Sequence, residues 1–157
     1  MRANSAWLFG GESLAVRAGV VWEFYATRPD APFAGLRRRA GFWKSLQKFL
    51  HDCRLACLEP DELSSVLRDG GVPPARADML SGLYGAYLDR LNRLNATDAA
   101  GAESELAGMM RARFEQIPLF EDIDQIEIRG IYDISAASFE WILELSRHRP
   151  TTVFLPL

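Results

Sequence analysis

The chain has 157 residues, of which 48% are hydrophobic and 25% are charged, and its formal net charge is −3. These values are ordinary for one soluble globular domain, and they exclude a protein that binds nucleic acid through a positive overall charge. No apolar run approaches the roughly 18 residues that span a bilayer, so we expect no membrane partner and a cytoplasmic location. Cys53 and Cys57 are expected to be reduced core thiols.

Most of the chain has apolar residues at helical spacing, interrupted by proline and glycine. The predicted helices, in chain order, are Ser13–Ala26, Phe33–Cys57, a segment that starts at Pro60 and ends at Gly70 and Gly71, Pro74–Asn92, and a segment capped by Thr97 or Asp98. The predicted apolar face of the first helix consists of Leu14, Ala18, Val21, Trp22 and Tyr25. That of the second consists of Phe42, Leu46, Phe49, Leu50, Cys53 and Cys57.

The last part of the chain changes to a β-α-β pattern. The segments "QIEI" and "TVFLPL" read as strands, and the helix between them, "SAASFEWILELSRH", is capped by Ser135. Such strands are expected to be parallel, with a right-handed crossover. Two strands do not make a stable sheet, so further strands must come from "AWLF" near the N-terminus, a partner chain or missing parts of a larger protein. The predicted class is α/β and predominantly helical, as a single domain or a fragment, with a mainly helical part at 12–118 and a β-α-β part at 119–157.

We expect no catalytic residue, cofactor or metal from the short motifs. The segment "WLFGGES" has a glycine pair before a helix, but it lacks the lysine of a phosphate-binding loop, and Glu12 would repel phosphate. His51, Cys53 and Cys57 fall short of the zinc ligand set, since His148 is the only other histidine. The acidic stretch "FEDIDQIE" is read as a solvated edge before a strand. Neither histidine lies in a motif that would activate a nucleophile.

The second predicted helix carries a local positive charge. Its candidate DNA-binding residues are Arg37, Arg38, Lys44, Lys48 and Arg54. The spacings of seven and four place Arg37, Lys44 and Lys48 on one face, which could follow a line of phosphates, and Trp43 or Phe42 could stack on a base. The alternative is an ordinary solvated face above a packed apolar stripe.

Two segments resemble the UvrD-like superfamily 1 helicases. In that family a tyrosine-bearing helix precedes a "DFDDLL" segment, and a later strand ends in "VDEFQDTN". The segment "YGAYLDRLNRLNATDAAGAESEL" resembles the first part, with Asp98 at the leading acid. The segment "IRGIYDISAASFEWILELS" resembles the second part, with Tyr132 and Asp133 at the glutamine and acid of "QDT". Arg129 and Gly130 fall where the magnesium-binding aspartate and the catalytic glutamate should be.

This resemblance implies a degenerate Walker B-like region at Arg129, Gly130 and Asp133. The "GIYD" segment is similar to "GFYD" in B subunits of AddAB type and in RecB-family exonucleases of the PD-(D/E)XK class. The resemblance covers roughly Gly35 to Leu157 and implies a helical 1B-like insertion followed by a β-α-β piece of a P-loop-type, helicase 1A-like parallel sheet. The Walker A segment, the later helicase motifs and the nuclease motif are missing.

The function implied is a non-catalytic helicase-like domain of a DNA repair or recombination helicase–nuclease. It would contribute scaffold and DNA contact, while other domains or subunits of an ATP-dependent helicase/exonuclease supply catalysis. The alternative is a helical protein–protein interaction module without a nucleic-acid role, which an apolar patch beside the Arg37–Arg54 face would favour. An active nucleotide hydrolase would need magnesium ligands that the sequence lacks.

Overall fold

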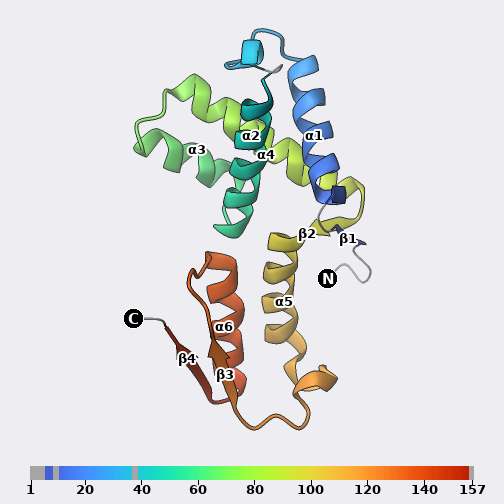
Figure 1. The fold of residues 1–157 in the computed structure, drawn as a ribbon, viewed down its shortest axis with the longest axis vertical. Helices are drawn as coiled ribbons and strands as arrows, with labels where there is room; N and C mark the ends of the chain where they lie inside the picture. Colours follow the sequence, from blue (N-terminus) through green and yellow to red (C-terminus); the bar gives the residue numbers. More distant parts are fainter. Residues whose placement is uncertain (1–5, 9–10, 37–38, 156–157) are drawn as a thin grey trace. The chain divides into compact units, whose positions relative to one another are not determined.

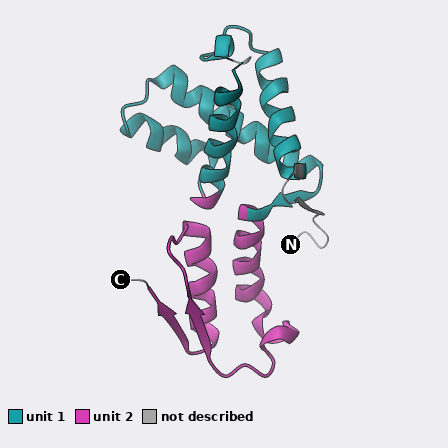
Figure 2. Cartoon of the chain, viewed as in Figure 1, with its two compact units in different colours: residues 1–54, 58–99 teal, residues 55–57, 100–157 magenta. Residues whose placement is uncertain are grey.

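The computed structural model describes residues 6–8, 11–36 and 39–155, so Arg37 and Arg38 lie outside the described residues. The chain divides into two compact units (Figure 2). The first unit consists of residues 1–54 and 58–99, and the second of residues 55–57 and 100–157. The described chain is predominantly helical, with small parallel pairs of strands.

The first unit is a helical assembly around one core. Its helices are α1 (Gly11–Ala26), α2 (Ala40–Leu55), α3 (Pro60–Asp69) and α4 (Pro74–Arg93), with a short 3₁₀ turn, η1 (Ala34–Leu36), before α2. Both α1 and α3 pack against α4 (Figure 1). The core is built on fully buried side chains from α1, α2 and α4: Val21, Tyr25, Leu50, Leu83, Tyr84 and Tyr87.

Local signals place the ends of α3 and α4 as predicted. Glu59 and Glu62 form a reciprocal capping box at the start of α3, where Pro60 occupies the first turn. The helix ends at Asp69 with Gly70 as its C-cap, and Gly71 follows with a φ of +82°, a conformation that suits glycine. Pro74 likewise begins α4. These bounds were predictable because each depends on neighbours in the sequence.

The structure corrects the predicted start and end of the second helix. Phe33 has a φ of 69°, which cannot continue a right-handed helix, so α2 begins at Ala40. At the other end, Cys57 has a φ of 54°, lies beyond the helix and is exposed, whereas Cys53 is buried as predicted.

The predicted apolar face of α1 is also partly wrong. Trp22 is 64% exposed and Leu14 is 47% exposed. The buried residues of α1 are Ser13, Val20, Val21, Phe24 and Tyr25. The physical reason is that α1 packs on α4 through the side that carries Val20, Val21 and Phe24, which leaves Trp22 at the margin of the core.

A short parallel pair of strands joins the two ends of the first unit. Strand β1 (Ala6–Leu8) pairs with β2 (Ala96–Asp98), with Leu8 opposite Asp98. The N-terminal strand therefore exists, but its partner is β2, a segment predicted only as a helix cap. Thr97 Oγ1 has no hydrogen-bond partner among the described residues, so this hydroxyl does not cap the following helix.

The second unit contains the predicted β-α-β segment. Its elements are α5 (Ala99–Arg113, within the unit from Ala100), the 3₁₀ turns η2 (Phe114–Gln116) and η3 (Pro118–Phe120), β3 (Ile126–Arg129), α6 (Ala136–His148) and β4 (Thr151–Phe154). Strands β3 and β4 are parallel, as predicted, and Ile128 lies opposite Val153. Met110, Phe114 and Leu145 form the core.

The small β3–β4 sheet has one packed and one exposed face. Ile126 and Ile128 pack on the core of the second unit, whereas Glu127 and Arg129 are exposed. Parallel strands that are covered on both faces are usually continuous apolar runs instead. In the described chain this sheet has two strands, and its expected place in a larger P-loop-type sheet remains a prediction. Within the same residues, no helix is long and apolar enough to cross a membrane.

Candidate functional site

The outer face of α2 carries the only lysines of the chain, Lys44 and Lys48. They are four residues apart, so they lie one turn apart on the same side of the helix, and both are exposed. Lys48 Nζ lies 2.6 Å from Asp52 Oδ2, also on the outer face. Within residues 39–155 and the other described segments, Lys44 has no ion-pair partner. The structure thus brings together two of the predicted phosphate-binding residues.

Arg54 lies apart from this lysine pair. Its Nε is 3.3 Å from Asp98 Oδ1, and its side chain is only 21% exposed. The guanidinium is therefore already paired inside the first unit, and we leave Arg54 out of the candidate interface. Arg37 and Arg38, the other predicted members, fall outside the described residues, so the candidate interface is the Lys44–Lys48 face.

An open hollow lies between α1 and α2, and it is lined by Trp22, Tyr25, Ala26 and Trp43. The Tyr25 ring meets the Phe42 ring edge-on, with 5.9 Å between centroids, so Phe42 belongs to the packed side of α2. Sequence reasoning identified Trp43 as a stacking residue. It missed Trp22, because helical spacing placed that residue on the apolar face with Leu14 and Ala18.

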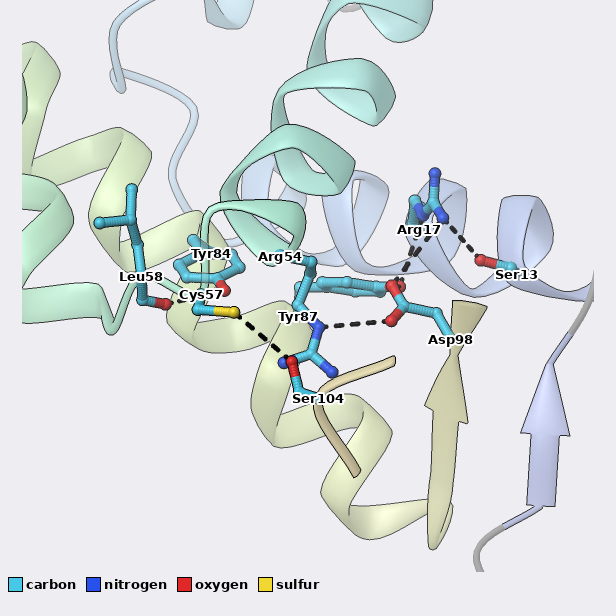
Figure 3. A network of polar contacts seen from close by, with 9 residues as sticks. All are labelled: Ser13, Arg17, Arg54, Cys57, Leu58, Tyr84, Tyr87, Asp98 and Ser104. Atoms are coloured by element: carbon cyan, nitrogen blue, oxygen red, sulfur yellow. Dashed lines mark hydrogen bonds and ion pairs between the residues drawn. The ribbon is translucent and has the colours of Figure 1, made fainter. Parts of the chain in front are cut away.

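Asp98 is the centre of a buried polar cluster in the first unit (Figure 3). Tyr87 donates a hydrogen bond of 2.7 Å to Asp98 Oδ2, and Arg54 Nε donates one of 3.3 Å to Oδ1. The second guanidinium, Arg17, places Nη2 3.9 Å from Oδ2 and donates to Ser13 Oγ at 2.8 Å. The cluster therefore connects α1, α2 and α4 to the end of β2.

The protonation of this cluster follows from burial and from the carboxylate. Burial raises the pKa of Tyr87 to about 12, and the negative charge of Asp98 adds to the rise, so the phenol stays neutral and donates. Burial alone would lower the pKa of Arg54, but the charges of Asp98 and Tyr84 and the hydrogen bonds to them together outweigh burial, and the pKa is raised. Asp98 has no exposed surface, so it cannot meet a substrate from solvent. The geometry is that of a structural ion cluster.

The end of β3 is the region that the helicase resemblance identifies as a nucleotide site. Arg129 Nη2 lies 2.8 Å from Glu127 Oε2, and the guanidinium lies 4.1 Å from the centroid of the Phe154 ring. Gly130 follows with a φ of +77°. A guanidinium held in this way would repel a cation, and glycine supplies no base.

The turn that follows leads into α6. Asp133 is exposed in this turn, and Tyr132 is 85% exposed. Ser135 caps α6 as predicted, because its Oγ accepts a 3.0 Å hydrogen bond from the Ser138 amide. Asp133 is therefore a loop residue, while capping belongs to Ser135.

The comparisons with known proteins find no relative: no family model matches the chain, and no curated protein is similar to it in sequence.

In the described segments, no three His, Cys, Asp or Glu side chains come close enough to hold a metal ion. Burial raises the pKa of the Cys53 thiol to about 12, with a contribution from Asp52. The candidate site therefore rests on geometry and charge alone.

Proposed function

We propose that the chain is a non-catalytic, helicase-like module of a DNA repair or recombination helicase–nuclease. In this proposal the first unit contacts the DNA backbone through the Lys44–Lys48 face, and other domains or subunits supply ATP hydrolysis and strand cleavage. The observation that carries the proposal is the placement of the only lysines of the chain on one exposed helix face. Arg129 and Gly130 at the end of β3 support the non-catalytic part of the proposal, because the arginine would repel a cation and glycine supplies no base.

The lysine pair suits phosphate because neither ammonium is locked into the protein. Lys44 is free within the described chain, and the Lys48–Asp52 pair is exposed on both sides, with side chains 72% and 50% accessible. Exposed ion pairs contribute about 0–1 kcal/mol, so a phosphate can replace Asp52 at little cost. Each phosphate that is neutralised releases counterions, which makes binding sensitive to salt.

A second candidate function, a protein-interaction module, is favoured by exposed apolar side chains, namely Trp22 at the hollow beside α2 and the outer side of α6. Phe139 is 54% exposed and Leu143 is 36% exposed, and their spacing of four places them on the same side of the helix. Exposed apolar side chains that gather in one place are typical of protein contacts. This reading needs no nucleic acid, so a binding titration separates the two candidates.

The test compares the native chain with Lys44→Glu/Lys48→Glu in binding to a fluorescent single strand and a forked duplex at about 50 and 200 mM salt. Loss of two phosphate contacts is expected to lower the salt slope by about 1.4, at ~0.7 per phosphate on single strands. The matched control is Arg93→Glu/Arg113→Glu, which changes the net charge equally at exposed positions outside α2.

A second readout uses the fact that Lys44 and Lys48 are the only lysines. DNA is expected to protect both from an amine-reactive reagent, with the reacted sites read by mass spectrometry. The proposal is wrong if the native chain and the lysine variant bind DNA with equal affinity and the lysines are labelled equally with and without DNA. The protein-interaction function would then be preferred.

A further inference from the structure

We propose that the hollow lined by Trp22, Tyr25, Ala26 and Trp43 is a stacking site for an unpaired nucleobase, so that the first unit prefers single-stranded nucleic acid over duplex. This inference rests on the proposed function, because it assigns a ligand to the surface beside the Lys44–Lys48 face. The lysines alone do not determine whether the ligand is single-stranded or double-stranded, whereas a stacking site for an unpaired base does.

The lining of the hollow is mainly aromatic. Three of its four lining residues, Trp22, Tyr25 and Trp43, are aromatic. Trp22 is 64% exposed, so its indole is accessible to a ligand from solvent. Bases stack on aromatic side chains whatever their sequence, because every base has a π face.

The polar end of Tyr25 is not available to a ligand in the hollow. Its hydroxyl donates to the Pro32 carbonyl oxygen at 3.1 Å and lies 3.3 Å from Met79 Sδ, so it is used inside the first unit. Tyr25 is 2% exposed, so the ring surface that the hollow offers to a ligand belongs to the tryptophans, which carry no hydroxyl that would read base edges. Such a site is expected to stack any of the bases, without preference for a particular sequence.

The positive charge beside the hollow distinguishes a nucleotide from an apolar protein side chain as its ligand. Lys44 follows Trp43 in the sequence, so their Cα atoms are about 3.8 Å apart, and Lys48 lies one turn further along α2. A nucleotide needs both a ring surface and a nearby cation, whereas an apolar side chain needs only the first. The hollow and the Lys44–Lys48 face together meet the need of a nucleotide.

The acids nearest in sequence to these residues do not oppose a phosphate. Glu23, which follows Trp22, lies 3.5 Å from Arg90 Nη2 of α4 and is directed to that helix. Asp52 pairs with Lys48 and lies about two turns of α2 from Lys44, so it leaves Lys44 available to a phosphate at the hollow. In a duplex the bases are already stacked, and extrusion of one base costs a few kcal/mol. The hollow is therefore expected to favour single strands.

The experiment measures binding of the full chain to a short oligothymidylate, to an abasic oligonucleotide of the same length and to a duplex. Trp22→Ala is expected to weaken oligothymidylate binding about 5- to 150-fold, the range measured for loss of one stacked base. It is expected to leave abasic and duplex binding unchanged, and Trp22→Phe is expected to restore part of the affinity. Circular dichroism checks that each variant is folded.

Tryptophan fluorescence gives an independent readout. Oligothymidylate is expected to quench the emission of the native chain, and Trp22→Phe is expected to remove part of this quenching. The matched control is Trp141→Phe, which changes a tryptophan of the second unit and is expected to preserve the quenching. Equal quenching in the native chain and in Trp22→Phe would contradict stacking at this residue.

The outcomes separate this inference from the proposed function. If Lys44→Glu/Lys48→Glu weakens binding while Trp22→Ala and the abasic strand have no effect, the stacking site is overturned and DNA contact stands. If the native chain binds none of the three oligonucleotides, both are overturned. Self-association that requires Trp22, detected by sedimentation without nucleic acid, would assign the hollow to a second copy of the chain and would also overturn the inference.

Discussion

Asp98 is held by groups from three helices, and this arrangement explains why a carboxylate can lie in the interior without exposed surface. Tyr87 and Arg54 donate to its two oxygens, and Arg17 lies near one of them. Taking an ion out of water costs several kcal/mol unless partners compensate. The cluster therefore specifies how α1, α2 and α4 meet β2. It also gives Arg54 a structural role, so DNA contact is not needed to explain this arginine.

Asp98→Asn is expected to destabilise the first unit by about 3 kcal/mol, the lower end of the range for breaking a buried ion pair. The reason is that Arg17 and Arg54, whose side chains are 11% and 21% exposed, lose their counter-charge. Urea unfolding measures the change. Asp133→Asn, in an exposed loop, is the control and should be nearly neutral; equal stabilities of the two variants would contradict the structural role of Asp98.

The two cysteines are expected to differ in reactivity. Cys57 is exposed, whereas Cys53 is buried and its thiol pKa is raised to about 12. Since the thiolate is the reactive form, an alkylating reagent at about pH 8 should modify Cys57 in the native chain and Cys53 only after denaturation. Mass spectrometry counts the modified sites. Rapid modification of native Cys57→Ser would show that Cys53 is accessible after all.

The turn between β3 and α6 shows how one element boundary depends on backbone conformation. Gly130 ends the strand in the left-handed region, with a φ of +77°, and Ser135 begins α6 with a side-chain cap. Arg129, just before the glycine, is occupied by Glu127 and Phe154. Gly130 therefore has a conformational reason to be glycine.

Gly130→Ala is expected to destabilise the second unit by about 1–2 kcal/mol, because a side chain is disfavoured at this φ. No atom lies within 4 Å of a Cβ at this position, so steric contact with neighbours does not contribute. The control is Gly108→Ala in α5, where a Cβ also has no neighbour within 4 Å and alanine should stabilise the helix by up to about 1 kcal/mol. Urea unfolding should give opposite signs; the same sign for both would contradict the interpretation.

At the scale of the whole molecule, the described residues form two cores that share no buried residue. The core of the first unit includes Leu50, Leu83 and Tyr87, and the core of the second includes Met110, Phe114 and Leu145. A cavity made in one core removes contacts from the helices around it. We therefore expect each unit to respond mainly to substitutions in its own core.

Leu83→Ala and Leu145→Ala test this expectation as a matched pair. Each removes a buried leucine, with 0% and 3% exposure, and each is expected to cost about 2–5 kcal/mol. Amide hydrogen exchange should then accelerate in α1 and α4 for Leu83→Ala, and in α6 for Leu145→Ala. Uniform acceleration along the chain for both variants would indicate a single cooperative unit instead.

Part of the candidate site was predictable, namely the positions of Lys44 and Lys48. A spacing of four on an amphipathic helix determines a shared face, and the apolar stripe shows which side is packed. The exposure of Trp22 was not predictable in this way. Its spacing from Leu14 and Ala18 fits an apolar face, and only the packing of α1 on α4 leaves that side open.

By itself, the sequence determined the bounds of α3 and α4 and the β3–α6–β4 order, because Pro60, the Glu59–Glu62 capping box and Ser135 act on adjacent backbone groups. Only the tertiary structure decided that β1 pairs with β2 and that Arg54 meets Asp98, 44 positions away. The physical reason is that periodicity specifies which face of an element is apolar, but not which distant element covers it. Strand pairing and buried ion pairs depend on that second choice.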